Sequence, residues 1–188
     1  MTDVEKKPVE LSFRPASDDD VAAIVALVEC TYRGDASRQG WTTEADLLDG
    51  QRIDPQGVKE SIEADRSRIV LAYAGSELAA CAHIQRRSAI GYFGMFSVRP
   101  GQQGGGLGGT VLAECERQLK DDLACDAVEI TVLKQRADLI PWYQRRGYRL
   151  TGERRPFPYG DERFGLPRVA DLEFVVLDKA LTANQADQ

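Results

Sequence analysis

A glycine tract at residues 101–109 is the part of the sequence best suited to chemistry, because six of its nine residues are glycine. An apolar run, residues 92–98, precedes it, and an amphipathic segment, residues 107–122, follows. Glycine lacks a Cβ, so the chain can turn through positive φ and approach a ligand closely. The start of a helix adds unpaired N–H donors and a partial positive charge. The tract therefore predicts a site for the phosphates of a pyrophosphate-containing cofactor.

Two familiar phosphate-binding motifs fit the glycine tract poorly. The tract lacks the Lys-Ser or Lys-Thr pair that ends a P-loop, which excludes that motif. The dinucleotide pattern G-x-G-x-x-G does match at Gly104, Gly106 and Gly109, with Asp126 at about the expected ~20 residues beyond. However, residues 99–103 separate the predicted strand from this pattern, and a dinucleotide turn begins where its strand ends. The nicotinamide or flavin interpretation is therefore disfavoured.

The segments around the tract predict a mixed α/β domain with one central β-α-β unit. Alternating or β-branched runs predict strands: residues 11–14, 69–73, 78–84, 92–98, 127–133, 148–152 and 171–177. Capping residues and helical spacing of apolar residues predict helices: one following residues 17–20, and others over residues 43–48, 55–65, 107–122 and 137–145. Residues 74–77 indicate a hairpin between two of the strands, and Gly147 suits the end of the last helix.

Composition narrows the class of protein. The 188 residues suit one well-cored domain, expected over residues 11–180 between flexible tails at residues 1–10 and 181–188. A net charge of −6 argues against a general nucleic-acid binder, and no apolar run is long enough to span a membrane. The four cysteines show no close pairing, and the N-terminus has no apolar signal core. We expect a cytoplasmic protein with reduced cysteines and no metal site.

Two motifs together resemble the GNAT superfamily of acyl-CoA-dependent N-acetyltransferases. Residues 103–108, Gln-Gly-Gly-Gly-Leu-Gly, match the family signature Q/R-x-x-G-x-G/A, and the Val-Arg-Pro of residues 98–100 is typical of the strand exit before it. About forty residues later, residues 141–148 (Pro-Trp-Tyr-Gln-Arg-Arg-Gly-Tyr) resemble the second landmark of the family. The order of the predicted elements also fits, so the resemblance covers roughly the whole domain.

The resemblance implies a GNAT fold, a mixed and mostly antiparallel sheet of six or seven strands flanked by helices, with acetyl-CoA as cosubstrate. It implies that the tract and helix start wrap the pyrophosphate while the edge of the preceding strand pairs with the pantetheine arm. The residues matching these parts are Phe96, Ser97, Val98, Gln103, Gly104, Gly105, Gly106, Leu107, Gly108 and Gly109. Arg136 stands where many relatives carry an Asn that contacts the cofactor; it could reach a CoA phosphate or be a solvated charge.

The reaction that the resemblance implies is direct attack by an amine on the thioester, through a tetrahedral intermediate. In similar enzymes a tyrosine at the position of Tyr143 protonates the departing thiolate; the alternative is that Tyr143 only packs helix against sheet. The base that takes the proton of the amine is left open among Glu129, Glu44, His83 and water. A non-catalytic acyl-CoA-binding module remains the main alternative function.

The acceptor side is the least readable part of the sequence. In similar enzymes it is formed by two connections, here residues 32–44 and 153–168. The second is rich in proline and aromatic residues, which suits a lid over the site, a rigid surface loop or a dimer contact. Acidic residues at Glu44, Asp46 and Asp49 are compatible with a cationic amine or with a solvated helix face. We expect a small-molecule or peptide amine as acceptor, and a monomer or homodimer.

Overall fold

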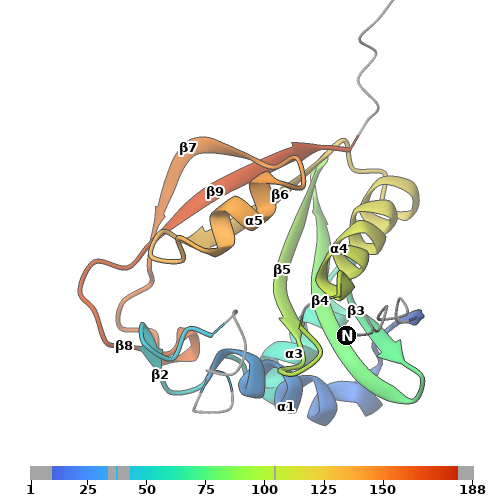
Figure 1. Cartoon of the computed structure of the whole chain (residues 1–188), viewed down its shortest axis with the longest axis horizontal. Coiled ribbons are helices and arrows are strands. Elements are labelled where there is room, and N and C mark those ends of the chain that lie inside the picture. The colour runs from blue at the N-terminus through green and yellow to red at the C-terminus, as the bar shows by residue number, and fades with distance from the viewer. Residues whose placement is uncertain (1–9, 34–36, 38–42, 104, 182–188) are drawn as a thin grey trace, which may run out of the picture.

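The computed structural model describes residues 10–33, 37, 43–103 and 105–181. Within these ranges a seven-stranded sheet runs in the order β1-β3-β4-β5-β6-β9-β7 (Figure 1). Its strands are β1 (Leu11–Pro15), β3 (Ser67–Ala74), β4 (Glu77–Arg87), β5 (Ile90–Val98), β6 (Ala127–Leu133), β7 (Arg149–Pro156) and β9 (Glu173–Ala180). All neighbours in this sheet are antiparallel except β5 and β6, which are parallel. The predicted mixed α/β class is confirmed.

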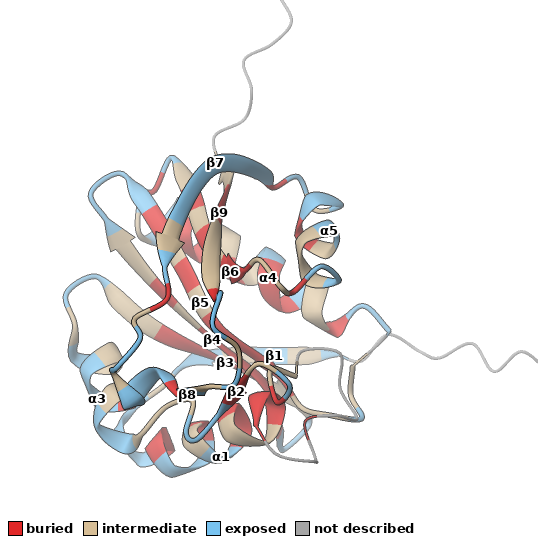
Figure 2. Ribbon diagram, turned by 90° about the vertical axis from the view of Figure 1, so that its left-hand side faces the viewer, coloured by how far each residue is buried: buried red, intermediate tan, exposed pale blue. Residues whose placement is uncertain are grey.

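Helices cover both faces of the sheet. On one face, α1 (Val21–Tyr32) and α3 (Pro55–Glu63) share an apolar cluster with β3 and β4. On the other, α4 (Leu107–Arg117) and α5 (Leu139–Gln144) share a larger cluster with the central strands. Figure 2 shows buried residues concentrated on the inner strands, whereas β7 at the sheet edge is exposed along most of its length. No helix in the described ranges is long and apolar enough to cross a membrane.

Local sequence explains where the first helices begin. Before α1, the Asp20 carboxylate accepts hydrogen bonds from the backbone N–H and the hydroxyl of Ser17, which is the predicted capping interaction. Before α3, the Asp54 carboxylate accepts from the N–H of Gly57 at 2.7 Å, and Pro55 occupies the first turn. Both helix starts were therefore readable from short polar signals.

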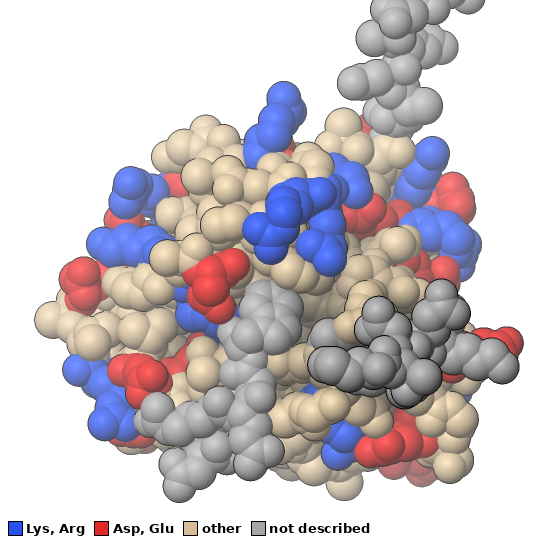
Figure 3. All heavy atoms as spheres, in the orientation of Figure 1, with Lys and Arg blue, Asp and Glu red and all other residues tan. Residues whose placement is uncertain are grey.

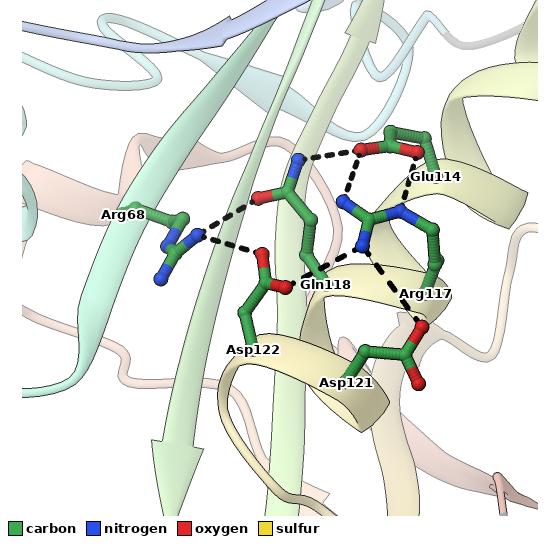
Figure 4. Close-up of polar contacts among 6 residues, drawn as sticks. All are labelled: Arg68, Glu114, Arg117, Gln118, Asp121 and Asp122. Atoms are coloured by element: carbon green, nitrogen blue, oxygen red, sulfur yellow. Dashed lines mark hydrogen bonds and ion pairs between the residues drawn. The ribbon is translucent and has the colours of Figure 1, made fainter.

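The end of α4 is held to the sheet by a group of charged and amide side chains, which we call the α4 network (Figure 4). Arg68 on β3 donates to Gln118 and Asp122, each at 3.2 Å. Arg117 donates to both oxygens of Glu114, at 2.9 and 3.0 Å, and also pairs with Asp121 and Asp122. The helix widens here into a π-helical turn, Gln118–Asp122, which brings these groups to β3.

The helix predicted over residues 43–48 is wrong. These residues form a turn followed by the short strand β2 (Leu48–Asp49), which pairs antiparallel with β8 (Leu166–Pro167). A six-residue segment cannot stabilise a helix by itself, so a distant partner decides its conformation. The pairing fastens the loop of residues 157–168 to the connection between α1 and α3.

The last strands also differ from prediction. Instead of residues 148–152 and 171–177, β7 spans Arg149–Pro156 and β9 spans Glu173–Ala180. The strand β7 pairs only with β9 and exposes most of its residues, including polar ones, so it lacks the apolar alternation of an inner strand. The hairpin of β3 and β4, and β6 over Ala127–Leu133, are confirmed.

Candidate functional site

The parallel strands β5 and β6 pair for only part of their length and then separate. Their register covers Ile90–Tyr92 against Ala127–Glu129, although the strands have nine and seven residues. Figure 1 shows β5 running on toward α1 while β9 and β7, beyond β6, lean away toward β8. A β-bulge contributes, because Met95 has a φ of 50° and the register against β4 shifts beside it. The central sheet is therefore opened by the backbone itself.

A cavity of about 420 Å³ occupies the opening between the two strands. Its walls include Phe96 on β5, Thr131 on β6 and Tyr143 on α5. Residues that line it also come from the β2 region and from the loop after β7, including Leu48, Phe157 and Phe164. Segments far apart in the sequence thus meet in one hollow, which is the usual form of a small-molecule site.

Two neighbouring tyrosines show which hydroxyl is available to an occupant of the cavity. The Tyr148 hydroxyl donates to Glu116 Oε1 at 3.0 Å, and Glu116 also binds Lys179. Tyr143 is 4 % exposed and lines the cavity, and among the described residues its hydroxyl has no hydrogen-bond partner. Burial raises the pKa of Tyr143 above its usual range, so the phenol stays protonated at neutral pH. The Tyr148 hydroxyl proton is thus bound to Glu116, whereas the Tyr143 hydroxyl proton is available to an occupant of the cavity.

The start of α4 has the form that the glycine tract predicted. Gly105 and Gly106 have φ values of 64° and 85°, and a Cβ added at either would meet no atom within 4 Å. No side chain caps the helix at Gly106, and no acidic residue lies in its first turn. The first N–H groups of α4 are therefore open to an anion. Gly104 lies outside the described residues.

A cationic side chain stands beside this helix start. The Arg146 guanidinium lies over the Trp142 ring at 3.6 Å, and its Nη2 is 3.4 Å from the Cβ position of Gly109. Arg146 forms no ion pair with a described residue, and burial together with the neighbouring Arg145 lowers its pKa. In the orientation of Figure 1, Figure 3 shows basic side chains gathered next to α5, which Arg145 and Arg146 directly follow. This charge suits phosphate groups.

The end of β5 presents backbone groups toward the opening. The Arg99 N–H donates to Ala79 on the β4 side at 2.9 Å. Because ladder bonds alternate in an antiparallel pair, the backbone groups of Val98 face the other way. Its carbonyl accepts from Gln103 Nε2 at 3.0 Å. Of the other predicted strand residues, Phe96 lines the cavity with its carbonyl bonded by Tyr32, and Ser97 is buried.

Arg136 is buried rather than solvated, so the solvated alternative is wrong. Its side chain is 6 % exposed, lines the cavity and pairs with Asp138 at 3.3 Å. Its position next to α5 places it near the phenols of Tyr32 and Tyr143, with which it interacts electrostatically.

The three candidate bases occupy different places. Glu44 lines the cavity, paired with Arg33 at 2.9 Å and with Arg52 at 3.7 Å. Glu129 does not belong to the lining, and both of its oxygens accept from Arg155, at 2.8 and 3.1 Å. His83 lines a second, adjacent cavity, and its Nε2 bonds the Ser67 hydroxyl at 2.7 Å. Burial and the charge of Arg87 lower the pKa of His83 to about 4.

Sequence reasoning missed a group of arginines on the acceptor side. Arg52, Arg87 and Arg155 line the cavity, yet they are about 35 and 68 residues apart in the chain. The only signal was the arginine pair of residues 154–155 beside the aromatic loop. That loop does border the cavity, through Phe157 and Phe164, as the lid interpretation required. Trp41, considered as a pocket residue, lies outside the described residues.

Comparisons with known proteins agree with this geometry. Residues 33–157 match a family model described as an acetyltransferase (GNAT) domain. The fold is similar to that of the ribosomal-protein-S18-alanine N-acetyltransferase from Escherichia coli, with a TM-score of 0.67 at 14 % identity over 95 % of this chain and 99 % of that one. It is also similar to YncA from Salmonella typhimurium, assigned as an acetyltransferase and solved with acetyl-CoA, with a TM-score of 0.66 at 16 % identity over 95 % and 98 %. No curated protein sequence matches significantly.

Proposed function

The chain belongs to the GNAT acetyltransferase family, and from this premise we propose that it transfers an acetyl group from acetyl-CoA to a primary amine. The observation that carries the proposal is the opening between β5 and β6, which holds a cavity lined by Tyr143, whose hydroxyl has no partner among the described residues, while β5 leads on to the uncapped glycine turn at the start of α4. A small-molecule or peptide amine would enter from the side of β7, β8 and α3. A cytoplasmic location is part of the same proposal.

The proposed cofactor site lies between α4, α5 and the end of β5. The left-handed turn at Gly105 and Gly106, the uncapped N–H groups of α4 and the Arg146 guanidinium would hold the diphosphate. The outward-facing backbone of Val98 would pair with the amides of the pantetheine arm. The acetyl-CoA bound in YncA, which shares the fold, supports this choice of cosubstrate. Acetyl-CoA supplies the activated acyl group.

Tyr143 is the proposed proton donor. When the amine nitrogen bonds to the carbonyl carbon and the carbon–sulfur bond breaks, the thiolate that leaves needs a proton. The buried Tyr143 phenol keeps its proton at neutral pH and faces the cavity without a competing partner among the described residues. The second property distinguishes it from Tyr148, whose hydroxyl donates to Glu116.

Glu44 is the base that the geometry favours. Of the three carboxylate and imidazole candidates, it is the one that lines the same cavity as Tyr143. It would take the proton of the incoming ammonium directly or through a water. Glu129 stays a prediction as a base, although its two contacts with Arg155 also give it the task of positioning that arginine.

A ligand-binding and turnover experiment tests the proposed function. Acetyl-CoA, CoA and NAD are compared for their effect on the melting temperature, since a ligand that binds the folded state stabilises it. We expect acetyl-CoA and CoA to raise the melting temperature, and thiol release to appear with an amine. A thermal shift without turnover across a broad amine panel would indicate an acyl-CoA sensor instead. A shift with NAD alone would refute the proposal.

A further inference from the structure

The charged residues that line the cavity are mostly of one sign. Among the described residues that line it, four are arginines and one is a glutamate: Arg52, Arg87, Arg136, Arg155 and Glu44. The chain as a whole has a net charge of −6, so this local excess of positive charge runs against its composition. Cationic groups repel a cationic acceptor and attract an anionic one. An acceptor whose only charge is its cationic amine, with which the nearby acidic residues are compatible, is therefore disfavoured.

Two of the four arginines already have strong partners. Arg155 donates to both oxygens of Glu129 and, through Nε, to Glu153 at 2.7 Å. Arg136 pairs with Asp138. Their donors are largely used by the protein, so we expect these two to shape the walls.

Arg87 and Arg52 are the arginines with donors to spare. Among the described residues Arg87 forms no ion pair; it bonds Gln85 Oε1 through Nε at 3.2 Å, and its guanidinium lies 3.9 Å from the centre of the Tyr92 ring. Within the described ranges Arg52 has one distant ion pair, its Nε 3.7 Å from Glu44. The fork of a guanidinium presents five N–H donors suited to a carboxylate or phosphonate, so most of them remain available in both residues.

Tyr92 brings these two arginines to the same part of the cavity. It lies under Arg87 and lines both cavities together with Arg52. Its ring folds over Gly94, where an added Cβ would lie only 2.0 Å from the phenol oxygen. Glycine at this position is thus required for Tyr92 to lie against the strand.

Part of the cavity lining, which we call the phenylalanine wall, is aromatic. Phe157, Phe164 and Phe174 line the same cavity as the arginines, and Phe157 and Phe174 stack with their ring centres 5.9 Å apart. This wall suits an apolar part of an acceptor.

We propose that the acceptor is a primary amine that carries an oxyanion group, a carboxylate or a phosphonate, bound by Arg87 and Arg52, with an apolar part against the phenylalanine wall. This inference rests on the proposed acetyltransferase function and names the substrate class of the same site. The amine end then points toward Glu44 and the acetyl group, while the anionic end anchors the molecule.

The test compares matched pairs of amines that differ only in the anionic group. L-amino acids are compared with their C-terminal amides, and 2-aminoethylphosphonate with ethanolamine, by acetyl-CoA-dependent thiol release. The value read is the ratio of kcat/KM for the charged member to that for the neutral one. The amino acid and phosphonate arms distinguish the two sources of the oxyanion.

Variants connect this ratio to particular side chains. Arg87→Gln removes the charge from an exposed residue and should lower the ratio by about 10- to 100-fold, the range expected for a hydrogen-bonded charge pair. Arg87→Lys keeps the charge without the fork and should lie between. Arg149→Gln is the matched control, because Arg149 is 79 % exposed on β7 and does not line the cavity. Arg52→Gln is a second test if its melting temperature stays close to that of the wild type.

The outcomes separate the inference from the function on which it rests. A preference for charged amines that falls in Arg87→Gln and not in Arg149→Gln supports the proposal. Equal use of both members, turnover of neutral amines alone, or a ratio unchanged by both Arg87→Gln and Arg52→Gln overturns it and leaves the acetyltransferase standing. Binding of acetyl-CoA without turnover of any charged amine also counts against it. Absence of both CoA binding and turnover removes the proposed function itself.

Discussion

The α4 network and the cavity contain the same kinds of charged residue, but these residues are paired with one another in the network and only partly paired in the cavity. In the α4 network two arginines face three carboxylates and a glutamine, and the side chains bond one another (Figure 4). In the cavity four arginines and one glutamate form the charged lining, and Arg87 has no carboxylate partner among the described residues. A closed network joins helix to sheet, whereas an open one leaves donors for a ligand. The number of arginine N–H donors without a protein partner therefore distinguishes a group that joins helix to sheet from one that can bind a ligand.

The largest effect on activity should come from Tyr143, which lines the cavity, and not from its neighbour Tyr148. Tyr143→Phe removes the proposed proton donor while keeping the ring, so kcat should fall about 100-fold or more, with little change in melting temperature. Tyr148→Phe is the matched variant: it loses the bond to Glu116, which should cost about 1–3 kcal/mol of stability and leave kcat close to wild type. Steady-state kinetics and thermal unfolding of both variants measure this. Equal activity of Tyr143→Phe and wild type would show that another group donates the proton.

The next effect compares the two glutamates. Glu44→Gln should lower kcat/KM by about 10- to 100-fold, because an amide cannot accept the proton of the amine. Glu129→Gln removes a carboxylate that faces Arg155, and should change kcat/KM less than tenfold by the same general scale. Values of kcat/KM for both variants, measured at the same pH, decide between them. A larger loss in Glu129→Gln would move the base to that strand.

A third prediction uses the pKa of His83 to detect the positive charge of Arg87, which has no carboxylate partner among the described residues. Burial, and then Arg87, lowers the pKa of His83 to about 4, below the ~6.5 of an unfolded chain. The unfolded state therefore takes up the proton first as the pH falls. The stability due to neutral His83 is complete above about pH 6.5 and is lost as the pH falls toward about 4, by roughly 2 kcal/mol between about pH 7 and 4.5. Urea unfolding at several pH values should show this slope in wild type and a reduced slope in His83→Gln.

The pKa of His83 can also be measured directly, because His83 is the only histidine of the chain and its NMR signal needs no assignment. In Arg87→Gln its pKa, followed by NMR titration, should rise while staying below the usual range, since burial is the larger cause. Arg149→Gln should leave it unchanged. A pKa that does not move in Arg87→Gln would mean that the charge is screened, and the comparison of the two regions would lose its basis.

The smallest effect belongs to the α4 network. Arg117 is 48 % exposed, and exposed ion pairs contribute little, so Arg117→Gln should lower the free energy of unfolding by less than about 1 kcal/mol and leave kinetics unchanged. Denaturant unfolding together with thiol release checks both. A loss of activity here would show that the end of α4 is coupled to the cavity.

The half of the site that we propose for the cofactor could be predicted from the sequence because its signals are local. The glycine turn, the capping residues of α1 and the strand Ala127–Leu133 depend on neighbouring residues, and each was found. Tyr143 was reached through a motif that spans only a few positions.

The acceptor half could not be predicted, because long-range pairing makes it. Strand β2 exists through β8, more than a hundred residues away, and the arginine group forms only when β4, the start of α3 and β7 come together. Glu44 could be named from its type, but nothing local indicated that Arg33 and Arg52 would hold it in the cavity. The sign of the charge in this half was likewise a product of tertiary structure.

The short pairing of β2 with β8 has an evolutionary consequence. Each strand contributes two residues, and together with the Arg168 N–H bonded to Leu47 they fasten the aromatic loop at one end. Insertions or exchanges between Phe157 and Leu166 would alter the shape of the wall without touching α4, α5 or the glycine turn. Under the proposed function, a lineage could therefore acquire new acceptors by changing about ten residues of one loop, while the proposed acyl-donor site is inherited intact.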